Sequence, residues 1–277
     1  MKAVTALDIS EQIDRKYAKD LERIKKFCLM DDDFFTKCFE GNTACIELVL
    51  RIVLEKQDLK VLDVRTQIFI ENILDRSVRF DVVATDDAGK KYDIEIQRRN
   101  KGASRKRARY HSSMMDANLL QKSTDFDELP ETYVIFITEH DVMGKGLPLY
   151  SVERYIVETG EKFEDDSHIL YVNGSYRDDS PVGKLMSDFF CTDPKEMNYG
   201  VLAERVSFFK ETREGVLTMC KIMEDVRNEG INIGRNEGVK SMVVKMLKKD
   251  KYKLEDIADI SGLSLDEVKK LRDGRML

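Results

Sequence analysis

The sequence predicts an α/β fold in which a mixed central sheet is flanked by helices and followed by a helical extension. Two strand-like runs on either side of the turn Asp86–Gly89 predict an antiparallel hairpin. A helical stretch and the apolar run 132–138 (TYVIFIT) come next, as in a chain that returns to a buried strand. The 277 residues are 42% hydrophobic with only 15 Gly and 4 Pro, so a sizeable core can form and collagen-like or disordered classes are excluded.

Charge and cysteine content narrow the class of protein. The chain has 46 Lys and Arg against 52 Asp and Glu, a net charge of −6, so any contact with nucleic acid needs a local basic patch. The five cysteines form no C-x-x-C pair, the N-terminus lacks the apolar region of a signal peptide, and no apolar run is long enough to span a bilayer. We expect a cytoplasmic protein with reduced thiols and no membrane partner.

The N-terminal half should alternate helices with strands. A 3.6-residue apolar period predicts an exposed amphipathic helix over 8–27, interpreted as a leading arm. Asp31–Asp33 offer caps to a helix with a buried phenylalanine cluster (Phe34, Phe35 and Phe39), and Gly41 precedes a second, mostly buried helix that ends near Lys56. Alternation of apolar and polar residues then predicts strands over 59–73, 78–84 and 91–97.

The C-terminal half is expected to be mostly helical. The pattern predicts a helix over 103–122, small strands near 154–158 and 168–172, and helices between 202 and 247. The expected organisation is an N-terminal helical arm (1–30), a core (31–210), a helical extension (211–250) and a small two-helix module (251–277).

Two local patterns mark the extension and the module. Gly230, Gly234 and Gly238 recur every four residues, which suits either a flexible linker or close helix packing in a homo-oligomer. In the module, Gly262 is a predicted helix C-cap, and Ser264 with Glu267 forms a predicted capping box.

The hairpin is the part of the chain that carries recognisable chemistry. Alternation places Asp81 on the opposite strand face from Phe80, and Glu95 and Gln97 on one face of the returning strand, so the three polar residues should converge on one side. Two carboxylates and the backbone carbonyl of Ile96 would form a hard oxygen site suited to Mg²⁺. Such an ion lowers the pKa of a bound water and offsets charge on a phosphate, as phosphodiester hydrolysis requires.

The arrangement Asp81 … Glu95-Ile96-Gln97 resembles the motif of the PD-(D/E)xK nuclease superfamily. Further blocks resemble one group within it, the Rpn (recombination-promoting nuclease) family or PD-(D/E)XK nuclease family transposases, over residues 30–210. The blocks are DDDFFTKCF (31–39), SVRFDVVATDDAGKKYDIEIQ (77–97), RARYHSSMMDAN (107–118), LPETYVIFITEHDV (129–142) and HILYVNGSY (168–176). The resemblance implies a restriction-endonuclease-like core and an endonuclease that cleaves DNA with Mg²⁺, or with Mn²⁺ in its place, in recombination or mobile elements.

Gln97 departs from the superfamily pattern, which has Lys at this position, although Gln is common in the Rpn-like group. Lys would bring a positive charge to the attacking water, whereas an amide offers only neutral donors and an acceptor. Gln97 is therefore expected to orient water, and the metal must carry more of the electrostatic load.

A basic stretch follows the returning strand. Seven of the twelve residues from 98 to 109 are Lys or Arg, and a DNA backbone would lie along this patch because phosphate contacts dominate nucleic-acid affinity. Arg105 and Arg109 share a helix face and are favoured together with Arg98. The resemblance adds Arg107 and Tyr110. The alternative is a solvated helix face paired with acidic residues.

Other candidate ligands have structural explanations. Glu47 is either an additional acidic metal ligand or the partner of Arg51 in an i,i+4 ion pair. Asp93 lies on the polar strand face, but a solvated edge residue is the favoured interpretation, and Asp31–Asp33 better suit a helix cap. The histidines lack metal-ligand spacing, which argues against a zinc site.

Two other classes of function stay open. One is a catalytically weak or inactive DNA-binding or targeting protein, in which the C-terminal module resembles half of a helix-turn-helix. The other is an interaction protein of a mobile element or defence system. Metal-dependent nicking distinguishes the first class from a nuclease, and salt-dependent DNA affinity distinguishes the second.

Overall fold

The computed structural model describes residues 17–71, 77–98, 100–249 and 251–274. They form two compact units, of which the first ends at Met219 and the second begins at Cys220. The predicted arm over 8–27 lies partly outside the described residues, and its described part is helical over 17–24.

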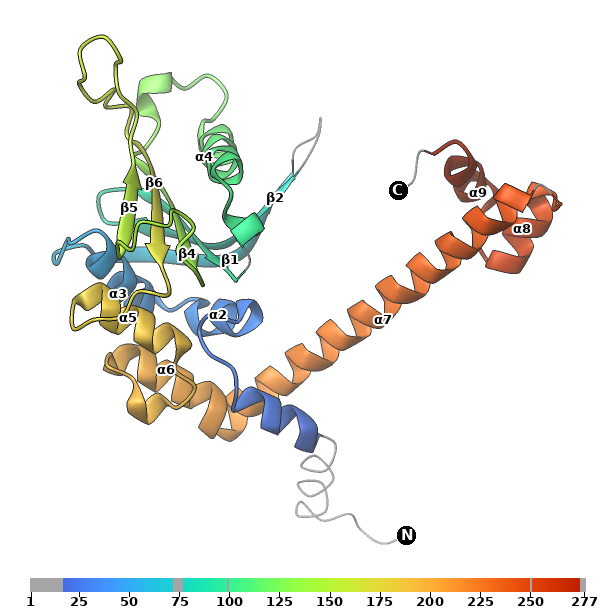
Figure 1. Cartoon of the computed structure of the whole chain (residues 1–277), viewed down its shortest axis with the longest axis horizontal. Coiled ribbons are helices and arrows are strands. Elements are labelled where there is room, and N and C mark those ends of the chain that lie inside the picture. The colour runs from blue at the N-terminus through green and yellow to red at the C-terminus, as the bar shows by residue number, and fades with distance from the viewer. Residues whose placement is uncertain (1–16, 72–76, 99, 250, 275–277) are drawn as a thin grey trace, which may run out of the picture. The chain divides into compact units, whose positions relative to one another are not determined.

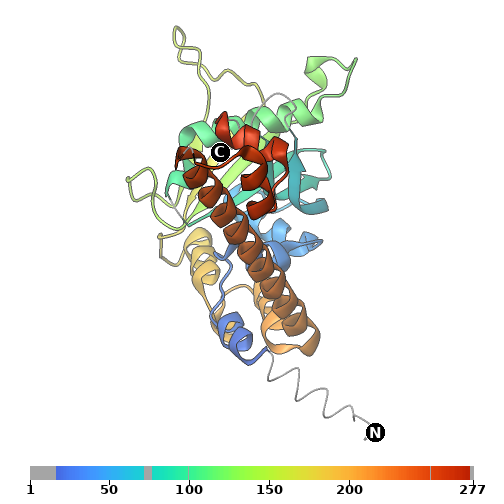
Figure 2. The same ribbon diagram turned by 90° about the vertical axis from the view of Figure 1, so that its right-hand side faces the viewer.

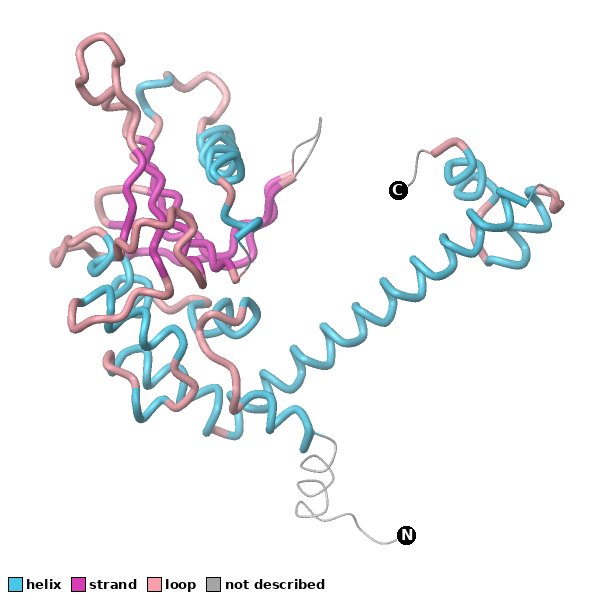
Figure 3. The backbone as a smooth tube through the Cα atoms, in the orientation of Figure 1, coloured by secondary structure: helices cyan, strands magenta, loops and turns pink. Residues whose placement is uncertain are grey.

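The first unit is built on one six-stranded sheet in the order β1-β2-β3-β4-β6-β5 (Figure 3). Strands β1 to β3 form an antiparallel meander, β3, β4 and β6 run parallel, and β5 returns antiparallel at the edge. The strands are β1 (Val61–Ile70), β2 (Val78–Asp86), β3 (Lys91–Gln97), β4 (Thr132–Thr138), β5 (Leu149–Val152) and β6 (Ser167–Asn173). This mixed sheet confirms the α/β class.

Helices cover both sides of the sheet (Figure 1). One side carries α2 (Asp32–Phe39), α3 (Thr43–Val53), α5 (Pro181–Phe190) and α6 (Gly200–Glu211), and the other carries α4 (Arg105–Leu119). The same layers can be followed in the view turned by 90° (Figure 2). Short 3-10 turns η1 (Asn100–Ala103), η2 (Phe126–Glu128) and η3 (Pro194–Glu196) complete the connections.

The core follows from these layers. Under α4, the residues Phe80, Phe136 and Tyr171 of three strands form one buried cluster with Met114 and Met115 of the helix. On the other side, the predicted phenylalanine cluster of α2 is fully buried, and the rings of Phe35 and Phe39 both lie near the ring of Phe189 in α5.

The second unit has a small core of its own. Val243 of the long helix α7 (Arg213–Lys249) packs with Ile257 of α8 (Leu254–Ser261) and with Val268 and Leu271 of α9 (Leu265–Arg272). The predicted caps are present: Gly262 ends α8 with φ 70, and Ser264 and Glu267 form a capping box. Among the described residues, no helix is long and apolar enough to cross a membrane.

The sequence prediction misplaced some elements. The strand expected near 154–158 is wrong, because the edge strand is Leu149–Val152 and Tyr155 makes only an isolated bridge with Lys162. Helix α5 was not predicted, although Ser180 caps it and Pro181 occupies its first turn. The helical stretch expected between 202 and 247 is divided at Thr212, whose hydroxyl accepts a hydrogen bond from Gly215 N and so caps α7.

Candidate active site

The two carboxylates of the predicted motif lie where β2 and β3 stop pairing. The backbone ladder between these strands runs from Thr85↔Lys91 to Val82↔Ile94. Beyond it, Asp81 N donates to Glu95 Oε1 at 2.9 Å, and Ile96 N donates to Asp81 Oδ2 at 3.1 Å. Each carboxylate is therefore held by the backbone of the opposite strand, and the side chains of Asp81 and Glu95 lie together.

Burial determines the electrostatics of this pair. Asp81 is 8% exposed and Glu95 is 0% exposed. Burial, together with the neighbouring charges of Glu95 and Asp32, raises the pKa of Asp81 to about 8. Burial also raises the pKa of Glu95 to about 8, with the charge of Asp93 as the next cause. The ionised forms of both carboxyls are therefore unfavourable in this site unless a positive charge lies nearby.

A buried network joins this pair to α4. Arg107 donates from Nη2 to Glu95 Oε2 at 3.1 Å and from Nε to His111 Nε2 at 3.1 Å. His111 Nδ1 lies 2.9 Å from Asp93 Oδ2. One oxygen each of Asp93 and Glu95 and one nitrogen of His111 lie within 4.8 Å of one another.

The sequence interpretation missed this network. Asp93 was expected at a solvated edge, which is wrong, because α4 covers it and it is 0% exposed. The sequence spacing of His111 does not indicate a ligand, because sequence spacing cannot report a contact between a strand and a later helix. The available signal was the set of three acidic or amide residues, Asp93, Glu95 and Gln97, at alternate positions on a buried strand.

Strict alternation also fails at Asp81. The ring of Phe80 lies 5.3 Å from the ring of His111, on the side of the sheet where Asp93 binds His111, so Phe80 and the acidic set share one side. The β1–β2 ladder passes from Thr66↔Val82 to Ile68↔Phe80, and the intervening Gln67 has φ 52. This left-handed residue interrupts the regular pleat opposite Asp81.

Gln97 points into the turn that precedes α4. A β-carbon added to Gly102 in η1 would lie 1.8 Å from Gln97 Oε1 and 3.6 Å from Arg107 Nη1. The amide of Gln97 therefore lies over Gly102, close to the guanidinium of Arg107. The absence of a side chain at residue 102 is what makes room for both groups.

The remaining basic candidates have different surroundings. Arg98 forms ion pairs with Asp31 and Glu139, while Arg105 contacts Met143 Sδ and Arg109 is exposed. Tyr110 is half-buried against the core cluster under α4. Of the five residues predicted to bind DNA, Arg107 is the one that directly contacts an acidic residue of the predicted motif.

The structure shows which partners Glu47 has on the helix that precedes the sheet. Glu47 pairs with Arg51 at 2.7 Å, as predicted for the structural alternative, and its other oxygen accepts a hydrogen bond from Val61 N. Val61 pairs with Asp86, at the opposite end of β2 from Asp81, so Glu47 is not brought to the carboxylate pair.

The aspartate run 31–33 divides between two roles. Asp31 precedes α2 but makes no side-chain cap. It accepts a hydrogen bond from Cys28 N instead and pairs with Arg98. Asp32 is near enough for its charge to raise the pKa of Asp81. Helix α2 therefore adds a negative charge to the site, which the helix-cap interpretation did not anticipate.

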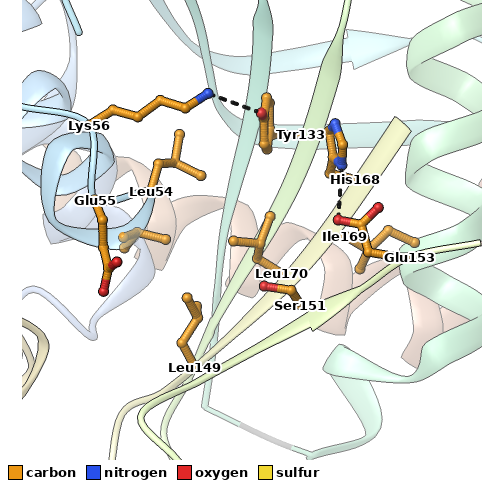
Figure 4. Close-up of a pocket in the computed structure, with 11 residues that line it drawn as sticks. Leu54, Glu55, Lys56, Tyr133, Leu149, Ser151, Glu153, His168, Ile169 and Leu170 are labelled. Atoms are coloured by element: carbon orange, nitrogen blue, oxygen red, sulfur yellow. Dashed lines mark hydrogen bonds and ion pairs between the residues drawn. The ribbon is translucent and has the colours of Figure 1, made fainter. Parts of the chain in front are cut away.

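A separate pocket of about 340 Å³ opens near the N-terminal ends of β4 and β6. Figure 4 shows Lys56 reaching the hydroxyl of Tyr133, and His168 reaching Glu153. These polar side chains already have partners among their neighbours, and the carboxylates of the motif are not among the pocket's lining residues. The chemistry therefore points to the carboxylate pair and not to this pocket.

A family model matches more than half of the chain. Residues 32–175 match the family described as PD-(D/E)XK nuclease family transposase, which confirms the resemblance inferred from the motifs. Comparison with curated proteins and with solved structures finds no match.

Proposed function

The chain belongs to the PD-(D/E)XK nuclease family transposases, and on that premise we propose that it is a metal-dependent endonuclease that hydrolyses phosphodiester bonds of DNA. The observation that carries the proposal is the pair of reciprocal hydrogen bonds that hold Asp81 and Glu95 together at the end of the β2–β3 ladder. Two adjacent carboxylates fixed by backbone donors are a rigid source of oxygen ligands.

The donor set fits a divalent cation. Asp81, Glu95 and the carbonyl of Ile96 would supply oxygen ligands, which Mg²⁺ and Mn²⁺ prefer. Both carboxyls have pKa values raised to about 8 by burial, so the acidic residues need a nearby positive charge to ionise at neutral pH. When bound, the ion would lower the pKa of a water molecule and offset charge on the scissile phosphate.

The surrounding residues would position the nucleic acid and the water. Gln97 would orient the attacking water through its amide. Arg98, Arg105, Arg107, Arg109 and Tyr110 would contact the DNA backbone, which carries the sequence-independent part of affinity. Glu47 is not part of this proposal, because both of its oxygens already have partners near β1.

A plasmid-nicking assay with and without Mg²⁺ tests the proposal. We expect nicking with Mg²⁺, loss of nicking in EDTA, and a decrease of at least about 100-fold in Asp81→Ala and Glu95→Ala, because each loses a charged ligand. Asp63→Ala is the matched control, since Asp63 is an exposed aspartate that pairs with Arg65. Nicking that is unchanged in EDTA, or in either site variant, would contradict the assignment, and salt-dependent binding alone would favour an inactive DNA-binding protein.

A further inference from the structure

We propose that His111 and Asp93 are positioning residues for catalysis, and that they hold Arg107 so that its guanidinium supplies the positive charge that Gln97 cannot supply. The inference rests on the proposed nuclease function. It assigns Arg107 to the reacting phosphate, beyond a general contact with the DNA backbone.

The hydrogen bonds of the network fix its proton positions. Arginine is always protonated, so Arg107 Nε is a donor and His111 Nε2 must accept from it. The imidazole is then the tautomer with its proton on Nδ1, which donates to Asp93 Oδ2. Asp93 thereby selects the tautomer that can hold Arg107. The hydrogen-bonded network runs from Asp93 through His111 and Arg107 to Glu95.

The packing around His111 makes this arrangement rigid. Its side chain is almost completely buried, and the rings of Phe80 and Phe136 lie 5.3 and 5.5 Å from the imidazole. Asp93 is fully buried on the strand that also carries Glu95. A guanidinium anchored through Nε to such a ring loses little orientation freedom when a phosphate binds.

The guanidinium is also in the right place. Its Nη2 binds Glu95 Oε2, and its Nη1 lies beside Gly102, over which the amide of Gln97 also lies. Arg107 thus occupies the space between the acidic ligand and the residue that stands where the superfamily has Lys. Its side chain is 38% exposed whereas that of Glu95 is 0% exposed, so Arg107 extends from the buried carboxylate towards the solvent from which a phosphate would approach.

Two substitutions of His111 separate positioning from packing. His111→Phe keeps an aromatic ring between Phe80 and Phe136 but removes the acceptor for Arg107. His111→Gln packs less well, but its amide oxygen can take the place of Nε2. Positioning predicts a single-turnover rate about 100-fold lower in His111→Phe and a better rate in His111→Gln, whereas a role in packing alone predicts the reverse order.

The rate should decrease while affinity is conserved. We expect the Kd for DNA, measured in Ca²⁺, to change little in both variants, because the charge of Arg107 is still present. In an Arg107→Ala background, His111→Phe should cause no further loss of rate, since the residue it positions is absent. Equal rates in the two His111 variants, a slower rate in His111→Gln, or additive losses would each overturn the inference.

NMR tests the same hydrogen-bonded network without an activity assay. In the metal-free protein, long-range ¹H–¹⁵N spectra should show His111 protonated on Nδ1, and the preference should weaken in Arg107→Ala and in Asp93→Leu. A His111 protonated on Nε2 would exclude the hydrogen bond from Arg107 and overturn the proposal. A wild-type protein that does not cleave DNA with any divalent metal would overturn the nuclease function as well, whereas cleavage with unaffected His111 variants would overturn only this inference.

Discussion

Gly102 and Gln97 are in such close contact that a β-carbon on residue 102 would lie 1.8 Å from Gln97 Oε1. The backbone of η1 thus sets the position of the amide that we assign to the attacking water. A turn residue without chemistry of its own determines where a proposed catalytic group lies.

The first prediction concerns this contact. Gln97→Ala should lower the single-turnover rate with little effect on DNA affinity, and Gly102→Ala should do the same because its methyl group displaces the amide. The double variant should be no slower than Gln97→Ala. Gln97→Lys should be tolerated or faster, since it restores a positive charge. An unchanged rate in Gln97→Ala would show that Gln97 does not orient the water.

The second prediction concerns the exposed basic face of α4. Arg105→Ala with Arg109→Ala should weaken binding to all DNA sequences similarly and reduce the slope of log affinity against log salt by about one unit for each lost phosphate contact. Arg98→Ala should have a smaller effect, because Arg98 is already paired with Asp31 and Glu139. If the double variant has the same salt dependence as the wild type, this face of α4 is solvated and does not contact DNA.

The third prediction concerns pH and the stability of the metal-free protein. Asp81 and Glu95 have folded-state pKa values of about 8, above their ordinary values of 3.8 and 4.5, so the folded state binds more protons than the unfolded state between these limits. The stabilising effect of protonation is complete below about pH 4 and is lost as the pH rises towards 8. In EDTA, the urea midpoint should therefore decrease over this range.

Asp81→Asn is the control for this pH effect. Its amide oxygen can still accept from Ile96 N, but it does not titrate, so the decrease between pH 4 and 8 should be smaller than in the wild type. Adding Mg²⁺ should stabilise the wild type most at the alkaline end, where both ligands are ionised. Parallel pH profiles for the two proteins would show that Asp81 does not titrate in this range.

The fourth prediction concerns the boundary of the proposed nuclease core. The sequence predicts that boundary at residue 210, and we propose that it lies after residue 219, because Met219 is fully buried and belongs to the first compact unit. A chain that ends after Asp225 should keep metal-dependent nicking and a thermal midpoint close to that of the full chain, because the second unit has its own core. A chain that ends after Lys210 should lose stability, since removing a buried Met costs about 2–5 kcal/mol.

The contrast between these two chains is the check on the boundary. Calorimetry measures the thermal midpoint of unfolding of both chains. Equal midpoints would support a boundary at residue 210. Light scattering on the chain that ends after Asp225 should reveal any self-association that depends on the second unit, which carries the glycines 230, 234 and 238.

Local signals explain what the sequence could predict. The α/β class, the hairpin around Asp86, the caps at Gly262 and Ser264, and the proximity of Asp81 and Glu95 all depend on patterns within a few residues or on one hairpin register. The contact between His111 and Asp93 links a strand to a helix that starts after a turn, and no periodicity encodes which helix residue reaches the strand.

Alternation also has a physical limit. It assumes a regular pleat, and the left-handed conformation of Gln67 breaks that pleat opposite Asp81. The pairing of Glu47 with Arg51 was accessible because both lie on one helix, whereas the effect of Asp32 on Asp81 depends on how α2 packs against the sheet.

The turn between β2 and β3 has a consequence for the order of folding. Asp86 accepts hydrogen bonds at Oδ1 from Ala88 N and Lys90 N, and at Oδ2 from the hydroxyl of Tyr92, so a single residue closes the hairpin locally. Loops this short close much faster than the long crossovers that join the parallel strands β3, β4 and β6. We expect the hairpin to be the folding nucleus, so that Asp86→Ala slows refolding with a φ-value near 1, whereas truncations in β6 mainly accelerate unfolding. Asp81 and Glu95 would then meet before the rest of the sheet is complete.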